Sequence, residues 1–251
     1  MSLKSFDQKI LNIYPGLIGI DESGRGCLAG PVVAAGVFVD KDFQIVKEKG
    51  IISEVNDSKQ VPEALRETLY LEFEEWQNKG WIKFAWAQAS VKEIDTFNIF
   101  SASGLAMHRV VEKLLDKIPS AIWPTRIEED LPLWNKWEEP SSTRTKIIID
   151  GKPIKKLLYV HEAIVKGDGK SLVIAMASII AKVMRDRLMK QLAQEYPGYG
   201  LEIHKGYATQ EHRSAIQERG PTDCHRSLFV KKVLSAAKQV PMEALLLGLE
   251  S

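Results

Sequence analysis

Four acidic side chains follow apolar stretches of the sequence. Two adjacent acids, Asp21 and Glu22, end the apolar run GLIGI, Asp150 ends the run KIIID, and Asp168 lies in a glycine-flanked turn after LLYVHEAIV. Because strand ends in α/β sheets meet at a common crevice, we expect these four side chains to share one site. Clustered carboxylates repel each other and raise each other's pKa unless a cation neutralises them. The pattern therefore indicates a cation site, although each acid alone is more typical of a charged turn.

Oxygen ligands favour hard divalent cations. Mg²⁺ and Mn²⁺ bind carboxylates while keeping several waters, and the histidines and cysteines are not spaced as a zinc site. Two such ions about 4 Å apart can activate water and stabilise the leaving oxygen when a phosphodiester is cut. We therefore expect a two-metal site holding Mn²⁺ or Mg²⁺.

The segment directly after the paired acids is suited to a sugar-phosphate backbone. Gly24 and Gly26 flank Arg25 in the phrase GIDESGRGCLAGP. Glycines let the backbone approach a ligand closely, and an arginine beside it can meet phosphate. A tight hairpin explains the three residues alone equally well, so the argument depends on the longer phrase.

A second polar segment, HKGYATQEHRSAIQERGPTDCHR, covers residues 204–226. The ring of Tyr207 can stack on a sugar or base, and Lys205 can meet phosphate. The three histidines of this segment lack the spacing of a zinc-binding helix pair. We expect them to be hydrogen-bonded structural groups.

Residues 171–198 carry the longest helical pattern. Ser178, Lys182 and Arg185 fall at i, i+4 and i+7, on one face that could follow a phosphate chain. The apolar residues between them are expected in the core: Ile179, Ile180 and Val183.

Asp186 of the same helix is an alternative fourth acid. It lies between Arg185 and Arg187 and can simply pair with them. We therefore prefer Asp168 as the fourth carboxylate.

Hydrophobic periodicity predicts the elements that must position these groups. Strands are expected at 17–22, 31–39, 81–90, 145–153 and within 157–171, and helices at 62–80, 98–117, 171–198, 209–220 and 226–240. The first two strands should form an antiparallel hairpin across the glycine-rich turn. This order predicts a mixed sheet with helices packed on it.

Charge is unevenly distributed along a nearly neutral chain of net charge +1. Residues 151–190 have nine Lys/Arg against three Asp/Glu, and such a basic segment can contact phosphates or be a solvated helix face. Residues 119–144 are rich in Pro and Trp, acidic and without periodicity. We interpret this stretch as a surface insertion, because long irregular loops are uncommon in compact domains.

Composition also limits the location of the protein. The chain has 251 residues, only two cysteines, no apolar run of about 18 residues and no signal-peptide core at its N-terminus. We expect a soluble cytoplasmic protein that does not associate with membranes. The apolar tail VPMEALLLGLE is expected to be a terminal helix, with a partner-binding peptide as the alternative.

Six phrases occur together in a recognisable order: GIDESGRGCLAGPVVAAGV, DSK, IIIDG, KGDGKSLVIAMASIIAKVMRDRLM, YPGYGLEIHKGYATQEH and GPTDCHRSLF. From about residue 17 to 235 the chain resembles bacterial ribonuclease HII, a type 2 ribonuclease H. The insertion 119–144 and the C-terminal tail depart from the usual pattern of that family.

The resemblance implies an RNase H-like α/β fold, a five-stranded mixed sheet flanked by helices with a helical C-terminal extension. It implies a catalytic domain over 1–198 and a substrate-binding extension over 199–251. The implied activity is cleavage of the RNA strand of RNA–DNA hybrids and incision 5′ of single ribonucleotides in duplex DNA, leaving 3′-hydroxyl and 5′-phosphate ends. We expect Mn²⁺ or Mg²⁺ as cofactor, a monomer, and a role in ribonucleotide excision repair. Contact with a replication clamp is left open.

The resemblance also implies roles for individual residues. Asp21, Glu22 and Asp150 match the metal-binding acids of the family, and Asp168 matches its fourth catalytic carboxylate. The family's loop that senses the 2′-hydroxyl corresponds to Gly24, Arg25 and Gly26. Its tyrosine, which packs on the sugar on the DNA side of the junction, corresponds to Tyr207. Further candidates for phosphate contacts are Lys59, Ser178, Lys182 and Lys205.

Two alternatives remain, a hybrid-only type 3 ribonuclease H and a non-catalytic hybrid-binding module. Type 3 relatives usually lack the arginine in the Gly-x-Gly turn, which this chain has as Arg25. A nucleotide-binding protein with a phosphate-binding glycine loop is disfavoured, because the loop leads into a strand and not a helix.

Overall fold

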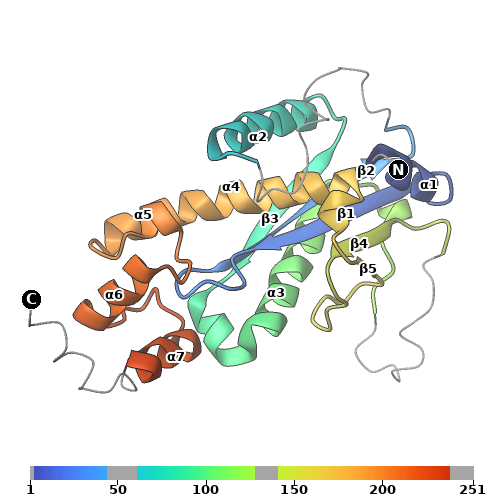
Figure 1. Cartoon of the computed structure of the whole chain (residues 1–251). Coiled ribbons are helices and arrows are strands. Elements are labelled where there is room, and N and C mark those ends of the chain that lie inside the picture. Colours follow the sequence, from blue (N-terminus) through green and yellow to red (C-terminus); the bar gives the residue numbers. More distant parts are fainter. Residues whose placement is uncertain (1–2, 44–60, 128–140, 238–251) are drawn as a thin grey trace, which may run out of the picture.

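The computed structural model describes residues 3–43, 61–127 and 141–237 (Figure 1). Its strands are β1 Gly16–Ser23, β2 Val32–Asp40, β3 Lys83–Ala89, β4 Lys146–Asp150 and β5 Glu162–Ile164. Its helices are α1 Leu3–Leu11, α2 Glu63–Asn78, α3 Val91–Leu115, α4 Leu172–Glu195, α5 Leu201–His204, α6 Gln210–Arg219 and α7 Ser227–Ala237, with 3-10 turns η1 Ser120–Ile122 and η3 Gly167–Gly169.

The strands form one mixed five-stranded sheet in the order β3-β2-β1-β4-β5, which confirms the expected fold class. The hairpin β1–β2 is antiparallel, as is β2–β3, whereas β1–β4 and β4–β5 are parallel. In the β1–β4 register Ile20 lies opposite Ile149. The next residue on each strand is an acid, Asp21 or Asp150, so the two acids leave neighbouring strands at the same end.

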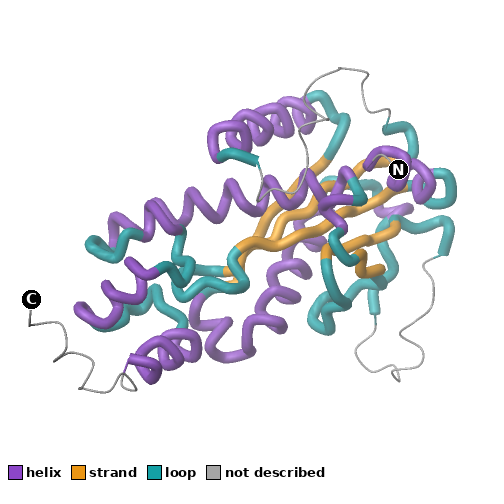
Figure 2. Tube along the Cα trace, in the orientation of Figure 1, coloured by secondary structure: helices purple, strands orange, loops and turns teal. Residues whose placement is uncertain are grey.

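Helices cover both faces of the sheet (Figure 2), and because side chains alternate along a strand, the core is divided between α3 on one face and α4 on the other. Ile18 and Ile20 of β1 pack with α3, whereas Leu17 packs on the other face with α4. Helix α4 lies very close to the sheet, because a Cβ at Gly19 would be 2.6 Å from a Val173 methyl group. The sheet is therefore covered on both faces, and its core fixes the strand ends that carry the acids.

Helix α3 is longer than the sequence pattern indicated. It begins at Val91 after a capping box in which Ser90 and Glu93 exchange hydrogen bonds, and it breaks at Asn98, with φ 68° and ψ 164°. The Asn98 side chain accepts hydrogen bonds from the amides of Phe100 and Ser101. Asn98 is thus the cap of a second helical segment, which is the segment that periodicity predicted from residue 98.

The outer edge of β3 is covered by basic side chains from α3. Arg109, Lys113 and Lys117, spaced four residues apart, donate to the carbonyls of Gln88, Trp86 and Phe84 at 2.8, 2.9 and 2.7 Å. Unpaired strand edges can recruit further strands, so these contacts occupy acceptors that another chain could use.

Three helices follow α4 and form the expected helical C-terminal extension (Figure 1). They share a small apolar cluster with Leu28, Ala29 and Met189. An isolated bridge between Ala29 and His225 ties this region to the loop between β1 and β2. Residues 238–251, including the apolar tail, lie outside the described residues.

The flanks of the proposed insertion are ordered parts of the fold. Arg126 forms an isolated bridge with Tyr159, and the amide of Thr145 donates to the carbonyl of Ile122 at 2.9 Å. Residues 119–127 therefore contact neighbouring parts of the fold. Of the proposed insertion, only 128–140 lies outside the described residues. Among the described helices, none has the length and apolarity needed to cross a bilayer.

Candidate active site

Asp21 and Asp150 lie side by side on the face of the sheet that α4 covers. Asp21 is only 6% exposed, and its Oδ1 accepts a hydrogen bond from the Glu22 amide at 2.7 Å. Oδ1 of Asp150 accepts one from the Gly167 amide at 2.6 Å. Backbone donors thus fix both carboxylates at the end of the parallel strand pair.

The position of Asp21 affects its ionisation. Burial raises the pKa of Asp21 well above its usual value, and the charges of Glu22 and Asp150 raise it further, while a hydrogen bond with Ser178 opposes the shift. A buried carboxylate under this repulsion favours a nearby positive charge.

Glu22 faces the opposite side of β1, as strand alternation requires. Its Oε1 lies 2.9 Å from Nη1 of Arg25, and the Arg25 guanidinium lies 4.4 Å from the centre of the Phe100 ring. The Arg25 side chain is 31% exposed, against 9% for Glu22. Arg25 is therefore oriented from two sides and still reaches the surface.

Asp168 lies in a tight turn after β5, and the preceding residue, Gly167, contacts Asp150. Lys166 has a left-handed conformation with φ 55°, and Gly167 then donates its amide to Asp150. A Cβ on Gly167 would be 2.7 Å from the Cδ1 methyl group of Ile174 and 3.3 Å from Oδ1 of Asp150, so a larger residue would crowd this turn. Asp168 follows immediately, and its Oδ1 accepts from the Gly169 amide at 2.9 Å.

Across the described ranges, no group of three or more His, Cys, Asp or Glu side chains could hold a metal ion by itself. The adjacent acids Asp21 and Asp150 nevertheless fit a hard cation chemically. Mg²⁺ in phosphoryl-transfer sites is typically bound by one or two carboxylates and completes its coordination with water and substrate phosphate. The donor set present here matches that partial coordination.

Arg185 does not contribute to the phosphate-following face that the sequence suggested on helix α4. Arg185 is fully buried, and it donates to the carbonyls of Ala29, Pro31 and Lys205 at 3.1, 3.2 and 2.8 Å. The prediction for Arg185 was wrong, because the loop between β1 and β2 covers it. Ile179, Ile180 and Val183 are in the core, as expected.

Two of the remaining α4 candidates lie beside other site residues. Ser178 hydrogen-bonds to Asp21, and the ammonium of Lys182 lies 5.9 Å from the centre of the Tyr207 ring. The Tyr207 side chain is solvent-accessible, with 40% of the residue exposed. Ser178 and Lys182, four residues apart on α4, therefore lie beside Asp21 and beside Tyr207, respectively.

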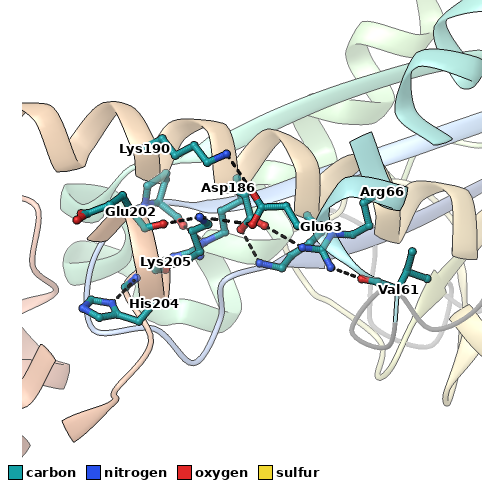
Figure 3. Close-up of polar contacts among 12 residues, drawn as sticks. Val61, Glu63, Arg66, Asp186, Lys190, Glu202, His204 and Lys205 are labelled. Carbon is teal, nitrogen blue, oxygen red and sulfur yellow. Dashed lines mark hydrogen bonds and ion pairs between the residues drawn. The ribbon is translucent and has the colours of Figure 1, made fainter. Parts of the chain in front are cut away.

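Asp186 is a structural ion-pair partner, although its partners differ from those expected. It pairs with Arg66 at 3.2 Å and with Lys182, and not with the adjacent Arg185 or Arg187 (Figure 3). Its 2% exposure and this pairing agree with the preference for Asp168 at the site.

Lys205 is held away from solvent. Its ammonium donates to the carbonyl of Glu202 and lies 3.7 Å from a carboxylate oxygen of Glu63 (Figure 3). Only 9% of its side chain is exposed, so a phosphate contact requires it to leave these partners. Lys59 lies outside the described residues.

The three histidines of the C-terminal region are hydrogen-bonded structural groups, as predicted. His204 contacts the carbonyl of Tyr199 at 2.8 Å, and His212 contacts that of Tyr207 at 2.9 Å. Nε2 atoms of His212 and His225 are 3.2 Å apart. Burial is the main reason that the pKa of His212 falls to about 4.

Comparison with protein families gives a match over most of the chain. Residues 18–232 match the family described as ribonuclease HII. Ribonuclease HII of Caldicellulosiruptor bescii is 39% identical over 230 residues, which are 91% of this chain and 94% of the relative. That of Fusobacterium nucleatum is 41% identical over 228 residues, with coverages of 90% and 91%.

Solved structures with the same fold are more distant in sequence. The RNase HII of Archaeoglobus fulgidus, solved in a complex with PCNA, has a TM-score of 0.61 and 21% identity, covering 90% of this chain and 98% of its own. Ribonuclease H2 of Pyrococcus horikoshii OT3 has a TM-score of 0.55 and 22% identity, with coverages of 89% and 99%. Bst-RNase HIII, solved with Mn²⁺, has a TM-score of 0.63 and 22% identity, with coverages of 92% and 73%. These likenesses support the fold.

Proposed function

The chain belongs to the ribonuclease HII family and is a ribonuclease H nuclease, and from this premise we propose that it also incises duplex DNA 5′ of a single ribonucleotide. The observation that carries the proposal is the adjacency of Asp21 and Asp150 beside the Gly24–Gly26 loop. Acids that can bind metal ions and a loop that can contact a ribose would then lie beside the same phosphodiester.

Asp21 and Asp150 would hold divalent ions, with Glu22 and Asp168 completing the acidic surroundings. Two bound Mn²⁺ or Mg²⁺ ions would supply an activated water and charge stabilisation for the leaving 3′-oxygen. The protein's own part is orientation: the Glu22 and Gly167 amides hold Asp21 and Asp150 in place before substrate arrives. Hydrolysis on this pattern leaves 3′-hydroxyl and 5′-phosphate ends. The Mn²⁺ bound by Bst-RNase HIII supports manganese as the first metal to test.

Recognition would depend on the ribose and not on base identity. The 2′-hydroxyl is the group that distinguishes RNA from DNA, and polar groups built to bind it are left unpaired by a deoxyribose. We assign recognition of the 2′-hydroxyl to Gly24, Arg25 and Gly26. We assign to Tyr207 the packing on the sugar of the adjoining deoxynucleotide. Contacts to phosphate from Lys59, Ser178, Lys182 and Lys205 would add affinity without sequence preference.

On this proposal the substrates are RNA–DNA hybrids and ribonucleotide-containing duplex DNA. The protein would act on them as a monomer in the cytoplasm, during ribonucleotide excision repair. The Archaeoglobus fulgidus neighbour was solved with PCNA, and a replication-clamp contact of this chain is proposed only on that likeness.

The proposal is tested with three duplexes of one sequence in Mn²⁺: DNA alone, DNA with one ribonucleotide, and a long hybrid. We expect cutting of the second and third and none of the first. Cutting of the long hybrid alone would favour a type 3 activity, and tight binding without any cutting would favour a hybrid-binding module.

A further inference from the structure

Two fully buried arginines hold the loop between β1 and β2 by its carbonyl groups. Arg226 donates to the carbonyls of Gly24, Arg25, Gly30 and Pro31 at 2.7, 2.9, 3.0 and 3.2 Å. Arg185 donates to those of Ala29, Pro31 and Lys205. In the part of the chain that the structure describes, neither guanidinium forms an ion pair with a carboxylate. Both cations are therefore used to bind backbone oxygens; below, Arg185 and Arg226 are called the arginine pair.

This arrangement sets the direction of the loop amides. The carbonyl and N–H of a trans peptide point in opposite directions, and the described chain has no cis peptide. Since the carbonyls of Gly24 and Arg25 point at Arg226, the amides of Arg25 and Gly26 point away from it. No described protein group accepts a hydrogen bond from these two amides. They remain available to an acceptor on a substrate.

The arginine pair also explains the glycine that opens the loop. Gly24 has φ 95°, and a Cβ there would come within 1.9 Å of Nε of Arg185. Gly30 has φ 79°, and a Cβ there would come within 2.3 Å of the Met189 sulfur. The loop is thus pressed directly onto α4 and the arginine that α4 carries.

Arg185 joins the loop to the segment that carries Tyr207. It donates to the carbonyl of Lys205, and its guanidinium lies 5.9 Å from the centre of the Tyr207 ring. The amide of Leu28 donates to the carbonyl of Gly206 at 2.8 Å. Loop and tyrosine are consequently fixed to each other, although they are far apart in the sequence.

We propose that Arg185 and Arg226 are positioning residues that hold the ribose-reading loop and Tyr207 as one rigid unit, and that this unit gives the enzyme its ability to act at a lone ribonucleotide. The inference rests on the proposed function. A single ribonucleotide in DNA offers one productive register, in which loop and tyrosine must both be in place. A long hybrid offers a 2′-hydroxyl at every step, so a displaced loop still finds one.

The test compares kcat/KM on the one-ribonucleotide duplex with kcat/KM on the long hybrid for Arg226→Lys. Lysine keeps the charge, but its donors come from a single nitrogen and cannot reach four divergent carbonyls. We expect the ratio of the two values to fall about 10-fold or more, a loss typical of an outer-shell partner.

Arg66→Lys is the matched control for general destabilisation. Arg66 is also buried and also donates to a carbonyl, that of Val61, while pairing with Asp186 (Figure 3). These two partners, Val61 and Asp186, lie outside the loop between β1 and β2. We expect this variant to melt at a lower temperature and to keep the wild-type ratio.

An unchanged ratio in folded Arg226→Lys would overturn the inference. Arg185→Lys, which removes the bonds to Ala29 and Lys205, is the second variant should the first not fold, and it must lower the same ratio. If the wild-type protein cuts only the long hybrid, the proposed function fails instead, so the two failures are distinguishable.

Discussion

At the scale of single residues, Tyr207 presents an exposed aromatic ring, with 40% of the residue accessible to solvent. Its ring is flanked by the cations of Lys182 and Arg185, each 5.9 Å from the ring centre. That setting supports a ring held in one orientation and ready to pack against a sugar.

Replacing Tyr207 tests this role. Tyr207→Ala should lower incision at a single ribonucleotide about 10-fold or more, because stacking on an aromatic ring is worth about 1–3 kcal/mol. Cutting of long hybrids should suffer less, and Tyr207→Phe, which keeps the ring, should retain most of both activities. Parallel steady-state assays measure this, and equal losses on both substrates would contradict the packing role.

The residues of the site differ in how far sequence could identify them. Asp21, Asp150 and Asp168 stand at the ends of apolar runs, a position with a recognisable pattern. Arg226 appears in the phrase CHRSLF without any such signal, because its partners are carbonyls that every residue carries. Arg185 was assigned to the surface on helical spacing alone, which cannot show that a loop covers it.

At the scale of elements, the covered edge of β3 has a consequence for association. The side chains of Arg109, Lys113 and Lys117 occupy three successive outward carbonyls of the strand. Replacing all three by alanine should expose the edge and produce concentration-dependent association, measurable by sedimentation velocity.

The control for this prediction carries the same change of charge. Exposed Arg213, Lys231 and Lys232, on α6 and α7, are replaced by alanine in a second triple variant. This control should sediment as the wild-type protein does. Similar behaviour of both variants would show that net charge, and not the strand edge, controls association.

Most elements with strong periodicity were predicted close to their true positions. Helix α1, Leu3–Leu11, was not predicted, and the other exceptions have physical causes. Helix α5, Leu201–His204, is a single turn without room for a period, and the break at Asn98 depends on one side chain bonding two amides. Residues 119–127 look irregular in sequence because their order comes from pairing with the chain around Tyr159.

At the scale of the whole molecule, the buried histidines make stability depend on pH. The rings of His204 and His212 stack with centroids 4.3 Å apart, and His212 and His225 share a contact between ring nitrogens. Burial lowers the pKa of His212 to about 4 from an ordinary 6.5, and that of His225 is also lowered. The folded chain therefore holds these rings neutral at a pH where the unfolded chain protonates them.

The stability contributed by neutral His212 should be fully present above pH 6.5 and lost progressively as the pH falls to about 4. Asp7, whose pKa burial raises to about 6, acts in the opposite direction in this range. The measurement is therefore the difference in Tm between wild type and His212→Gln, in which the contribution of Asp7 cancels.

This difference should shrink by several degrees between pH 7 and pH 5, since 1 kcal/mol corresponds to about 2–4 °C in a domain of this size. A difference that stays constant over this range would show that His212 is not held neutral by the fold.

The account as a whole depends on one feature, the meeting of Asp21 and Asp150 from distant parts of the chain at a metal-dependent site. The direct measurement is incision of duplex DNA with one ribonucleotide, by wild type and by Asp150→Asn, over a range of Mn²⁺ concentrations. Asparagine keeps an oxygen that can accept from the Gly167 amide, so the fold and its Tm should be retained.

We predict that wild type cuts 5′ of the ribonucleotide when Mn²⁺ is added and does not cut when divalent metal is withheld. Asp150→Asn should lose more than about 100-fold of this activity, beyond what the loss of an outer-shell partner costs. Incision by folded Asp150→Asn at the wild-type rate, with the wild-type Mn²⁺ dependence, would contradict the account.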